Sequence, residues 1–512
     1  MRNSGKSIAG TLLLIAAIIG LWWNQVQSQE TGITVDAKTA ESGTDEKVRP
    51  YCEGWKKPPL AFFITGRQHG YIEPCGCTGL ANQKGGLARR QTLYRDLKSR
   101  GWPLVPIDVG NQVRRFGPQP AIKFQTTMSA LRDMKYEAVG IGPDDLRLDI
   151  GELLSEVAAP NGTPLVSGNV SVYGEKASNG AKIVKVGAYT IGITSVIGKQ
   201  EQKGIKGEEV AFTDPAIAVK SAYKKFEKAG CNLLVLLCYA SSKETLAIAT
   251  SSAEAKNFNV VITAGGADEP ALEPERIKGT EQSYVIQTGK KGMYVGILGI
   301  YPGTKKPIRY ERIPSDKRFK DSPEMLKSLA SYQDQLKDIY MSDWTRLILK
   351  PVTHPSGRKF VGSEACGDCH DTAFGVWQKT PHHEATHSIA FPNERSSIKR
   401  NFDPECLSCH VTGWDPQGYY PYVSGYEQFD KSKHLHGNGC ENCHGPGSAH
   451  VAAENGEGDL SDAQIEAIRE SMVLPLDKAE AHCLKCHDQD NDPDFQEDGA
   501  FEKYWEQIKH YE

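Results

Sequence analysis

The sequence predicts two parts of different fold class: an α/β layered domain over residues 58–312 and a mostly helical and coil domain over residues 358–512. In the first part, apolar runs with the length and β-branched content of buried strands alternate with helical stretches. In the second part this alternation fades, and the pattern Cys-x-x-Cys-His occurs four times. A chain of 512 residues is also too long for one ordinary core, so two or three domains are expected.

The N-terminal 57 residues precede both domains. A short basic region, MRNSGK, leads into IAGTLLLIAAIIGLWW, which is mostly apolar. This pattern predicts that residues 1–28 are a secretory signal cleaved near Val26-Gln27-Ser28, or an uncleaved membrane anchor held by its two tryptophans. Residues 29–57 are polar, without a hydrophobic period, and are expected to be a linker. Either reading places the rest of the chain outside the cytoplasm, in the periplasm or on the outer face of the cytoplasmic membrane.

The α/β domain is expected to contain parallel and antiparallel strands. The apolar runs predict strands at residues 59–65, 103–109, 164–170, 232–238 and 259–264, helices at 121–134 and 216–230, and hairpins at 181–196 and 283–301. A helix capped by Ser322, with Pro323 in its first turn, is predicted inside a helical linker over residues 313–357. Its apolar stripe fits equally a helix that packs on its own domain and a spacer between domains.

The four Cys-x-x-Cys-His motifs are the pattern by which two thiols join haem vinyl groups while the adjacent histidine binds the iron. Zinc also binds paired Cys-x-x-Cys groups, but zinc sites do not require a histidine directly after every second cysteine. About 155 residues for four haems agrees with haems replacing side chains as the core. The motifs predict four covalent c-type haems, attached at Cys366, Cys369, Cys406, Cys409, Cys440, Cys443, Cys483 and Cys486, with His370, His410, His444 and His487 as iron ligands.

A low-potential electron carrier normally needs a second axial histidine on each iron. The C-terminal part offers more histidines than four irons require: His354, His382, His383, His387, His434, His436, His450, His482 and His510. His482 abuts Cys483 and is poorly placed to reach another iron, so we expect it to be structural.

The segments VGSEACGDCHDTAFGVWQKTPHHEAT, CLSCHVTG, GCENCHGPGSAHV and CLKCHDQDNDPDF together resemble the tetrahaem cytochrome c554 family over residues 358–512. The resemblance implies that His382, His450 and His510 are distal ligands, with His434 a weaker candidate beside His436. The family often has a second histidine seven residues after the tryptophan, where this chain has Glu384. Some members leave one iron with an open face, which would permit small-molecule chemistry.

Residues 59–312 resemble the metallophosphatase domain of 5′-nucleotidases, an α/β/β/α sandwich in which Asp, His and Asn side chains hold two metals. The family's ligand positions are largely replaced here, by Arg67-Gln68-His69, Gly110-Asn111, Gly142-Pro143-Asp144-Asp145, Ala264-Gly265-Gly266-Ala267 and Cys238 or Tyr239. Too few ligands remain for two metals, so no dinuclear centre is expected. His69 is either a ligand relic or an acid/base partner for nearby thiols.

Cys75-Gly76-Cys77 follows the first predicted strand, and GGLARR follows it in turn. This combination resembles the 5′-nucleotidase-like thiol proteins in which selenocysteine can take a cysteine position. Arg67, Arg89, Arg90 and the start of a helix near Gly86 would lower the pKa values of these thiols. A structural disulfide is the alternative, but Cys-x-Cys would close a strained small ring. We therefore expect Cys75 and Cys77 to be catalytic thiols.

Charge is divided unevenly along the chain. Residues 358–512 contain 13 basic and 28 acidic residues, although the whole chain has a formal net charge of only −4. This acidity fits a soluble surface, or a docking face for a basic redox partner, and it excludes nucleic-acid binding. The expected protein is an exported electron carrier whose thiol site meets an unidentified small molecule. Its rivals are a pure carrier with a partner-binding front domain, a phosphoesterase with an appended cytochrome, and catalysis at an open haem iron.

Overall fold

The computed structural model describes residues 50–73, 83–114, 118–160, 162–205, 207–343, 346–347, 350–393, 396–488 and 491–510. The predicted leader, most of the predicted polar linker, and the predicted thiols Cys75 and Cys77 lie outside these residues. No helix within the described ranges combines the length and the apolar character that a membrane crossing requires.

Two six-stranded sheets form the centre of the N-terminal domain. The first is mixed and has the strand order β15-β14-β1-β2-β3-β4. Its central strand β1 pairs in parallel with β2 and antiparallel with β14, which forms a hairpin with β15. The strands are β1 (Leu60–Thr65), β2 (Leu104–Asp108), β3 (Ala138–Gly140), β4 (Leu165–Val166), β14 (Tyr294–Ile300) and β15 (Ile308–Pro314).

The second sheet has the order β12-β13-β11-β10-β8-β7, with parallel pairing from β8 to β13 and antiparallel edges. Its strands are β7 (Lys182–Val186), β8 (Tyr189–Ile197), β10 (Leu233–Tyr239), β11 (Val260–Thr263), β12 (Glu275–Arg276) and β13 (Tyr284–Gln287). A small three-stranded sheet is formed by β5 (Val170–Val172), β6 (Glu175–Lys176) and β9 (Val210–Phe212).

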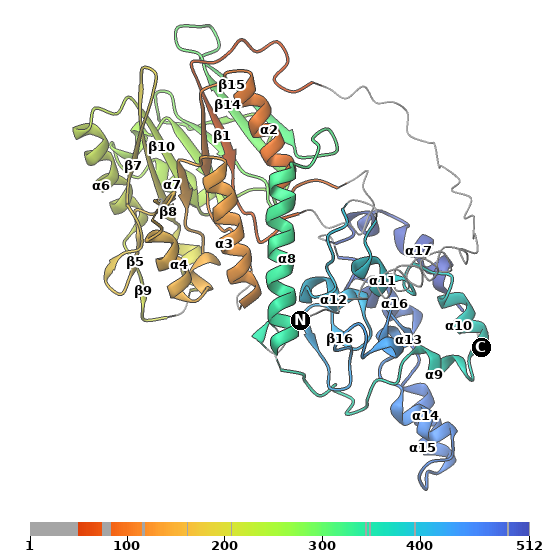
Figure 1. Ribbon diagram of the computed structural model, residues 1–512. Coiled ribbons are helices and arrows are strands. Elements are labelled where there is room, and N and C mark those ends of the chain that lie inside the picture. Colours follow the sequence, from red (N-terminus) through yellow and green to blue (C-terminus); the bar gives the residue numbers. More distant parts are fainter. Residues whose placement is uncertain are drawn as a thin grey trace, which may run out of the picture. The chain divides into compact units, whose positions relative to one another are not determined.

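The two large sheets are packed face to face between layers of helices, as the alternation along β10 shows. Leu233, Val235 and Leu237 belong to the core between the sheets, whereas Leu234 and Leu236 belong to a second core under the outer helices. In Figure 1, α2 (Leu87–Ser99), α3 (Pro118–Asp133) and α8 (Pro323–Asp343) cover the first sheet, while α6 (Pro215–Lys228) and α7 (Ser242–Ala249) cover the second. The α/β/β/α architecture expected from the sequence is therefore confirmed.

Shorter helices complete this domain: η1 (Asp145–Arg147), α4 (Ile150–Val157), α5 (Lys199–Gln202) and η2 (Ala255–Asn257). Asp214 caps α6 through the backbone N–H groups of Ala216 and Ile217, as the sequence Asp-Pro at a helix start leads one to expect.

One predicted hairpin, residues 283–301, is wrong. Its first strand, β13, pairs with β11 and β12 in the second sheet, whereas its second strand, β14, pairs with β1 and β15 in the first. The connecting Thr288–Met293 segment crosses between the sheets. The predicted strand at 164–170 is likewise split between β4 and β5, which lie in different sheets. Apolar alternation indicates strands, but it does not indicate which sheet each strand joins.

Residues 50–57, the described part of the predicted N-terminal linker, and helix α8 of the predicted helical linker pack on this domain. Cys52 is buried, its backbone N–H donates to Glu311, and Trp55 stacks on Trp102 at 6.0 Å between ring centres. Helix α8 buries Leu329 and Leu336 against α2 and α3. The same helix also contacts the C-terminal domain through Tyr332 and Tyr340, so both readings of its stripe hold in part.

The C-terminal domain consists of short helices and turns, as expected. Its helices are α9 (Ser363–Gly367), α10 (Asp371–Trp377), α11 (Ala385–Ala390), α12 (Pro404–His410), η4 (Lys433–Leu435), α13 (Cys440–His444), α14 (Ser448–Glu454), α15 (Asp462–Glu470), α16 (Leu476–Cys483), η5 (Pro493–Gln496) and α17 (Ala500–Ile508). Among the residues described here, the sheet is limited to the two-residue strands β16 (Trp414–Asp415) and β17 (Tyr420–Pro421).

Candidate functional site

Each Cys-x-x-Cys-His motif forms a turn of helix. The second and third motifs lie within α12 and α13. In the first and fourth, the backbone N–H groups of His370 and His487 donate to Cys366 and Cys483 at 2.9 Å. A helical turn places residues three and four apart on one face, so both sulfurs and the histidine of each motif can address one ligand.

The Nδ1 atoms of the motif histidines His410, His444 and His487 each lie within hydrogen-bond distance of an oxygen. His410 Nδ1 lies 2.7 Å from the Ala385 carbonyl oxygen, His444 Nδ1 lies 2.7 Å from the Met472 carbonyl oxygen, and His487 Nδ1 lies 2.7 Å from Asp492 Oδ2. Carbonyl and carboxylate oxygens accept only, so Nδ1 carries the proton and donates. The lone pair of each ring is then on Nε2, the tautomer that a histidine needs when its outer nitrogen binds a metal.

The structure places three motif histidines beside the three stronger distal candidates, with the ring planes inclined by 24°, 56° and 56°. The ring centres are 6.1 Å apart for His370 and His450, 6.0 Å apart for His382 and His487, and 5.9 Å apart for His444 and His510. A metal-bound imidazole nitrogen lies about 2.0–2.1 Å from its metal. Because the ring centre lies about 1 Å further out, two rings on opposite sides of one iron are separated by roughly 6 Å.

The remaining motif histidine, His410, differs from the other three. No histidine ring among the described residues is paired with it as in the other three, although it lies close enough to His382 to help lower the pKa of that ring. His434, the weaker distal candidate, is exposed on η4. His436 donates through Nε2 to the Phe429 carbonyl at 2.8 Å, and His482 donates through Nε2 to the Asn442 carbonyl at 2.7 Å, in agreement with a structural role for His482.

Burial favours the metal-binding form of these rings. It lowers the pKa values of His410, His444 and His450, and lowers the pKa of His382 to about 4. A histidine ligand must be neutral to offer its lone pair. The residues present therefore fit a bis-histidine haem at three positions. They fit haem at the fourth through Cys406, Cys409 and His410.

The motifs also lie in neighbouring pairs. The Cys366 thiol is hydrogen-bonded to Cys440, and the Cys486 thiol to Cys409. Buried Glu441, inside the third motif, accepts the backbone N–H groups of Val361 and Gly362 just before the first. The first motif thus adjoins the third, and the second adjoins the fourth. Such proximity would suit electron transfer between haems bound at neighbouring motifs of this domain.

The turns compared above with the metal-binding turns of metallophosphatases contain two carboxylates, Asp144 and Asp145. Both are hydrogen-bonded to other groups of this chain. Asp145 accepts backbone N–H groups of Asn111, Gln112, Val113 and Gly142. Burial raises the pKa of its carboxyl to about 7, against these bonds. Asp144 and Asn111 exchange two hydrogen bonds of 2.8 Å. Among the described residues, no group of three His, Cys, Asp or Glu side chains is arranged to hold a metal.

The ends of the Cys-Gly-Cys segment are both held by arginines. Glu73, two residues before Cys75, forms a two-pronged ion pair with Arg400, whose Nη2 lies 2.8 Å from Glu73 Oε2. Gln83, on the other side, accepts from Arg89 in the first turn of α2. Arg90 is fully buried and donates to Gln68 instead. Arg400 lies six residues before Cys406 and interacts with it, so Glu73 lies close to the second motif.

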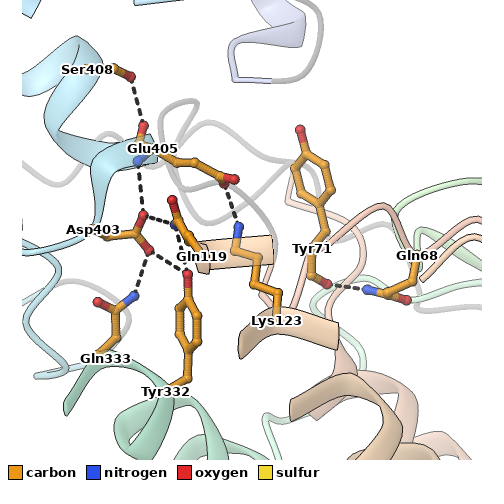
Figure 2. Close-up of polar contacts among 9 residues, drawn as sticks. All are labelled: Gln68, Tyr71, Gln119, Lys123, Tyr332, Gln333, Asp403, Glu405 and Ser408. Carbon is orange, nitrogen blue, oxygen red and sulfur yellow. Dashed lines mark hydrogen bonds and ion pairs between the residues drawn. The ribbon is translucent and has the colours of Figure 1, made fainter. Parts of the chain in front are cut away.

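A buried carboxylate, Asp403, also joins the two domains, three residues after Arg400 in the chain. Asp403 caps α12 and accepts from Tyr332 and Gln333 of α8 at 3.2 and 3.0 Å, and from Gln119 of α3 (Figure 2). Lys123 of α3 forms an ion pair with Glu405 in the next turn. The helix that carries the second motif is therefore fixed directly to two helices of the N-terminal domain.

Two residues of the site were missed from the sequence. Asp403-Pro404 immediately before the second motif is a helix-start signal, and it could have identified Asp403 as a cap. Asp492 lies in an acidic run after the fourth motif, where nothing distinguishes the one carboxylate that meets His487.

Comparison with known proteins agrees with this division of the chain. Residues 365–445 match the family model described as cytochrome c554 and c-prime. Cytochrome c-554 of Nitrosomonas europaea is 33% identical over 98 residues, covering 17% of this chain and 39% of that protein. Snake venom 5′-nucleotidase of Crotalus adamanteus is 24% identical over 247 residues, covering 44% of this chain and 41% of that protein. The chain thus spans about two fifths of the length of each of these relatives.

Two solved structures are similar to part of the chain. A Thermus thermophilus sulfate thiohydrolase SoxB bound to glycerol is 12% identical, with a TM-score of 0.47 over 58% of this chain and 63% of that chain. A 5′-nucleotidase precursor, also from Thermus thermophilus, is 18% identical, with a TM-score of 0.45 over 60% of this chain and 62% of that chain. The C-terminal part accordingly carries a cytochrome c554 domain, and the N-terminal part is similar to 5′-nucleotidases.

Proposed function

We propose that this protein is an exported electron carrier with four covalent c-type haems in its C-terminal domain. The observation that carries the proposal is the set of three histidine pairs with ring centres 5.9–6.1 Å apart. Haem iron between two histidines exchanges single electrons with little rearrangement, because two strong ligands hold it low-spin in both states. The paired motifs, the occupied Nδ1 atoms and the apolar leader in the sequence all support this reading.

The first test counts haems and their ligands. A pyridine haemochrome assay and the intact mass should give four haems per chain. Replacing His450 by alanine should convert one low-spin signal in the electron paramagnetic resonance spectrum into a high-spin signal, because one iron loses its second ligand. His354→Gln is the matched control, since His354 bonds to Ser356 and should leave the spectrum unchanged. A His450→Ala spectrum identical to that of the wild type contradicts the assigned pair.

The second part of the proposal concerns Cys75 and Cys77. In one direction these thiols lose two electrons and two protons as an S–S bond forms between them, and the C-terminal domain accepts the electrons one at a time. In the other direction the bond is reduced by two electrons and two protons. The Glu73–Arg400 ion pair supports this coupling, because it ties the residue at the start of the thiol segment to the segment that precedes Cys406.

Replacing both Cys75 and Cys77 by serine tests the coupling. The double variant should lose reduction of the haems by small-molecule thiols at least tenfold while keeping the wild-type absorption spectrum, because only the two-electron site is removed. Cys231→Ser, in the same domain, is the control and should behave as the wild type. Undiminished haem reduction in the double variant removes the thiol site from the proposal and leaves a carrier whose front domain serves another purpose.

One observation favours a second function, small-molecule chemistry at the iron bound by His410. This ring is paired with no other histidine among the described residues, unlike the other three motif histidines. A high-spin ferric signal in the wild-type protein that shifts when nitric oxide is added would support this function. A nucleotide hydrolysis assay with and without manganese or zinc tests the remaining alternative, phosphoesterase activity.

A further inference from the structure

We propose that a cavity beside the second motif binds a small neutral aromatic molecule that carries hydroxyl groups, of the hydroquinone class. The cavity has a volume of about 630 Å³ and is lined by α8 together with residues from 390–391, 397–402 and 428–430. This volume falls within the range of roughly 300–1,000 Å³ that is typical of small-molecule sites. The described residues that line it include no motif cysteine and no histidine, so the residues that would attach haem do not form it.

The first observation is a pair of buried amide oxygens without donors. Gln333 and Asn401 both line the cavity, and they are only 6% and 8% exposed. Gln333 Oε1 and Asn401 Oδ1 have no hydrogen-bond partner among the described residues. Gln333 Nε2 donates to Asp403 Oδ2 at 3.0 Å, which fixes the orientation of this amide and leaves its oxygen as the free end (Figure 2). Native structures usually give such oxygens a donor, so the cavity favours a ligand with O–H groups.

The second observation is an aromatic wall. Phe391, Phe402 and Phe429 all line the cavity. Phe391 meets Phe429 edge to face at 5.7 Å between ring centres, and Phe402 is held in the same way against Tyr340 at 5.7 Å. Phe391 is nevertheless 49% exposed, which leaves part of its ring available to pack on a ligand. Such a wall suits a flat aromatic ring.

The third observation is the balance of charge. The charged side chains among the described lining residues are Asp334, Lys337, Lys399 and Asp430, two of each sign. Lys399 Nζ lies 5.0 Å from the centre of the Phe391 ring, so part of this charge is already directed at an aromatic face. A lining without net charge favours a neutral ligand over a phosphate or a nucleotide.

The position of the cavity selects a hydroquinone among such ligands. Phe402 lies four residues before Cys406, and Ala390, also in the lining, ends the helix whose Ala385 carbonyl accepts from His410 Nδ1. Two walls are thus continuous with segments that hold the second motif. A hydroquinone that is oxidised to its quinone releases two protons and two electrons, and the electrons would pass singly to two ferric haems of the C-terminal domain. This electron donation rests on the function proposed above, whereas the binding does not.

Anaerobic calorimetric titration of the full-length haem-loaded protein tests the binding, with 1,4-naphthohydroquinone as the probe. The haems are reduced with dithionite beforehand, so that no electron transfer accompanies binding. The wild type should bind the probe saturably at one site per chain. It should bind 1,4-dimethoxynaphthalene, which has the same rings without hydroxyl donors, at least tenfold more weakly. The haem spectrum and the thermal midpoint establish that every variant is folded.

Two variants remove opposite features of the cavity. Asn401→Leu removes one free acceptor and should weaken binding of 1,4-naphthohydroquinone at least tenfold, and Phe391→Ser should weaken it through loss of ring packing. Gln335→Leu is the matched control, because it makes the same kind of change at an exposed position of α8 outside the cavity and should bind as the wild type does. Absence of saturable binding by the wild type, as expected if a bound haem fills the cavity, overturns the proposal. Equal affinity of the wild type and Asn401→Leu does so too.

Stopped-flow mixing of the oxidised protein with 1,4-naphthohydroquinone tests the electron donation. At probe concentrations below saturation, Asn401→Leu should reduce its haems at least tenfold more slowly than the wild type. Reduction by dithionite, which needs no cavity, should be equal in both proteins. An unchanged rate with the hydroquinone overturns the donating role. If the protein carried no haem, the function proposed above would fail, and titration of that protein would still decide whether the cavity binds the probe.

Discussion

Among the motif histidines His410, His444 and His487, only His487 has a carboxylate, that of Asp492, as its Nδ1 partner. His410 and His444 donate to neutral carbonyls, whereas His487 donates to a carboxylate whose side chain is only 4% exposed. A buried carboxylate makes the imidazole a more basic ligand than a carbonyl does, and a more basic ligand stabilises the ferric state. Among these three positions, we therefore expect the lowest reduction potential at His487.

Asp492→Asn tests this expectation. The amide is a weaker acceptor, so the potential of the haem bound by His487 should rise by on the order of tens of millivolts. Spectroelectrochemical titration of the whole protein measures the change. Asp488→Asn removes a neighbouring charge and keeps the Nδ1 acceptor, so its effect should be clearly smaller. Equal shifts in the two variants would mean that the negative charge near the haem, and not the hydrogen bond to His487 Nδ1, sets its reduction potential.

At the scale of single elements, α12 depends most on the contact between domains. Asp403 caps this helix and also satisfies Gln119, Tyr332 and Gln333 in a buried setting. Asp403→Ala should destabilise the holoprotein by about 2–4 kcal/mol, because it removes a cap and leaves buried donors without an acceptor. Asp214→Ala, which removes the partly exposed cap of α6, should cost about 1 kcal/mol.

Denaturant unfolding followed by haem absorbance and by circular dichroism measures both variants. Asp403→Asn, which keeps an acceptor oxygen, should fall between Asp403→Ala and the wild type. Equal stabilities of the two alanine variants would mean that the buried contacts of Asp403 contribute nothing beyond the cap.

The elements were predicted well from sequence where one physical signal decides them. The continuous apolar run over residues 232–238 predicted a strand buried on both faces, and the Cys-x-x-Cys-His spacing predicted where the motif turns lie. The role of His382 as a distal ligand could be stated only through the family resemblance, and its pairing with His487 was not predicted, because residues a hundred positions apart carry no local signal. The predicted hairpin over β13 and β14 was wrong for the same reason, because a hairpin and a crossover between sheets have the same local sequence pattern.

At the scale of the whole molecule, we expect the uneven charge to govern encounters with other proteins. The C-terminal domain has more than twice as many acidic as basic residues. Electron transfer to a small basic cytochrome should therefore slow at least tenfold between about 10 and 300 mM salt, because screening weakens long-range attraction. Stopped-flow mixing measures the rate. An acidic flavodoxin-type partner is the control, and its rate should rise with salt; equal slopes for both partners would contradict a docking role.

The burial of Asp403 between the two domains also limits how the C-terminal domain could be moved into another protein. Transplanting residues 358–512 onto an unrelated carrier would keep all four haem motifs yet strip the helix bearing Cys406 of three of the groups that bond to its cap. A working chimera would have to bring along α3 and α8, or supply new donors in their place. We therefore expect residues 358–512 alone to be less stable than the same residues in the full chain.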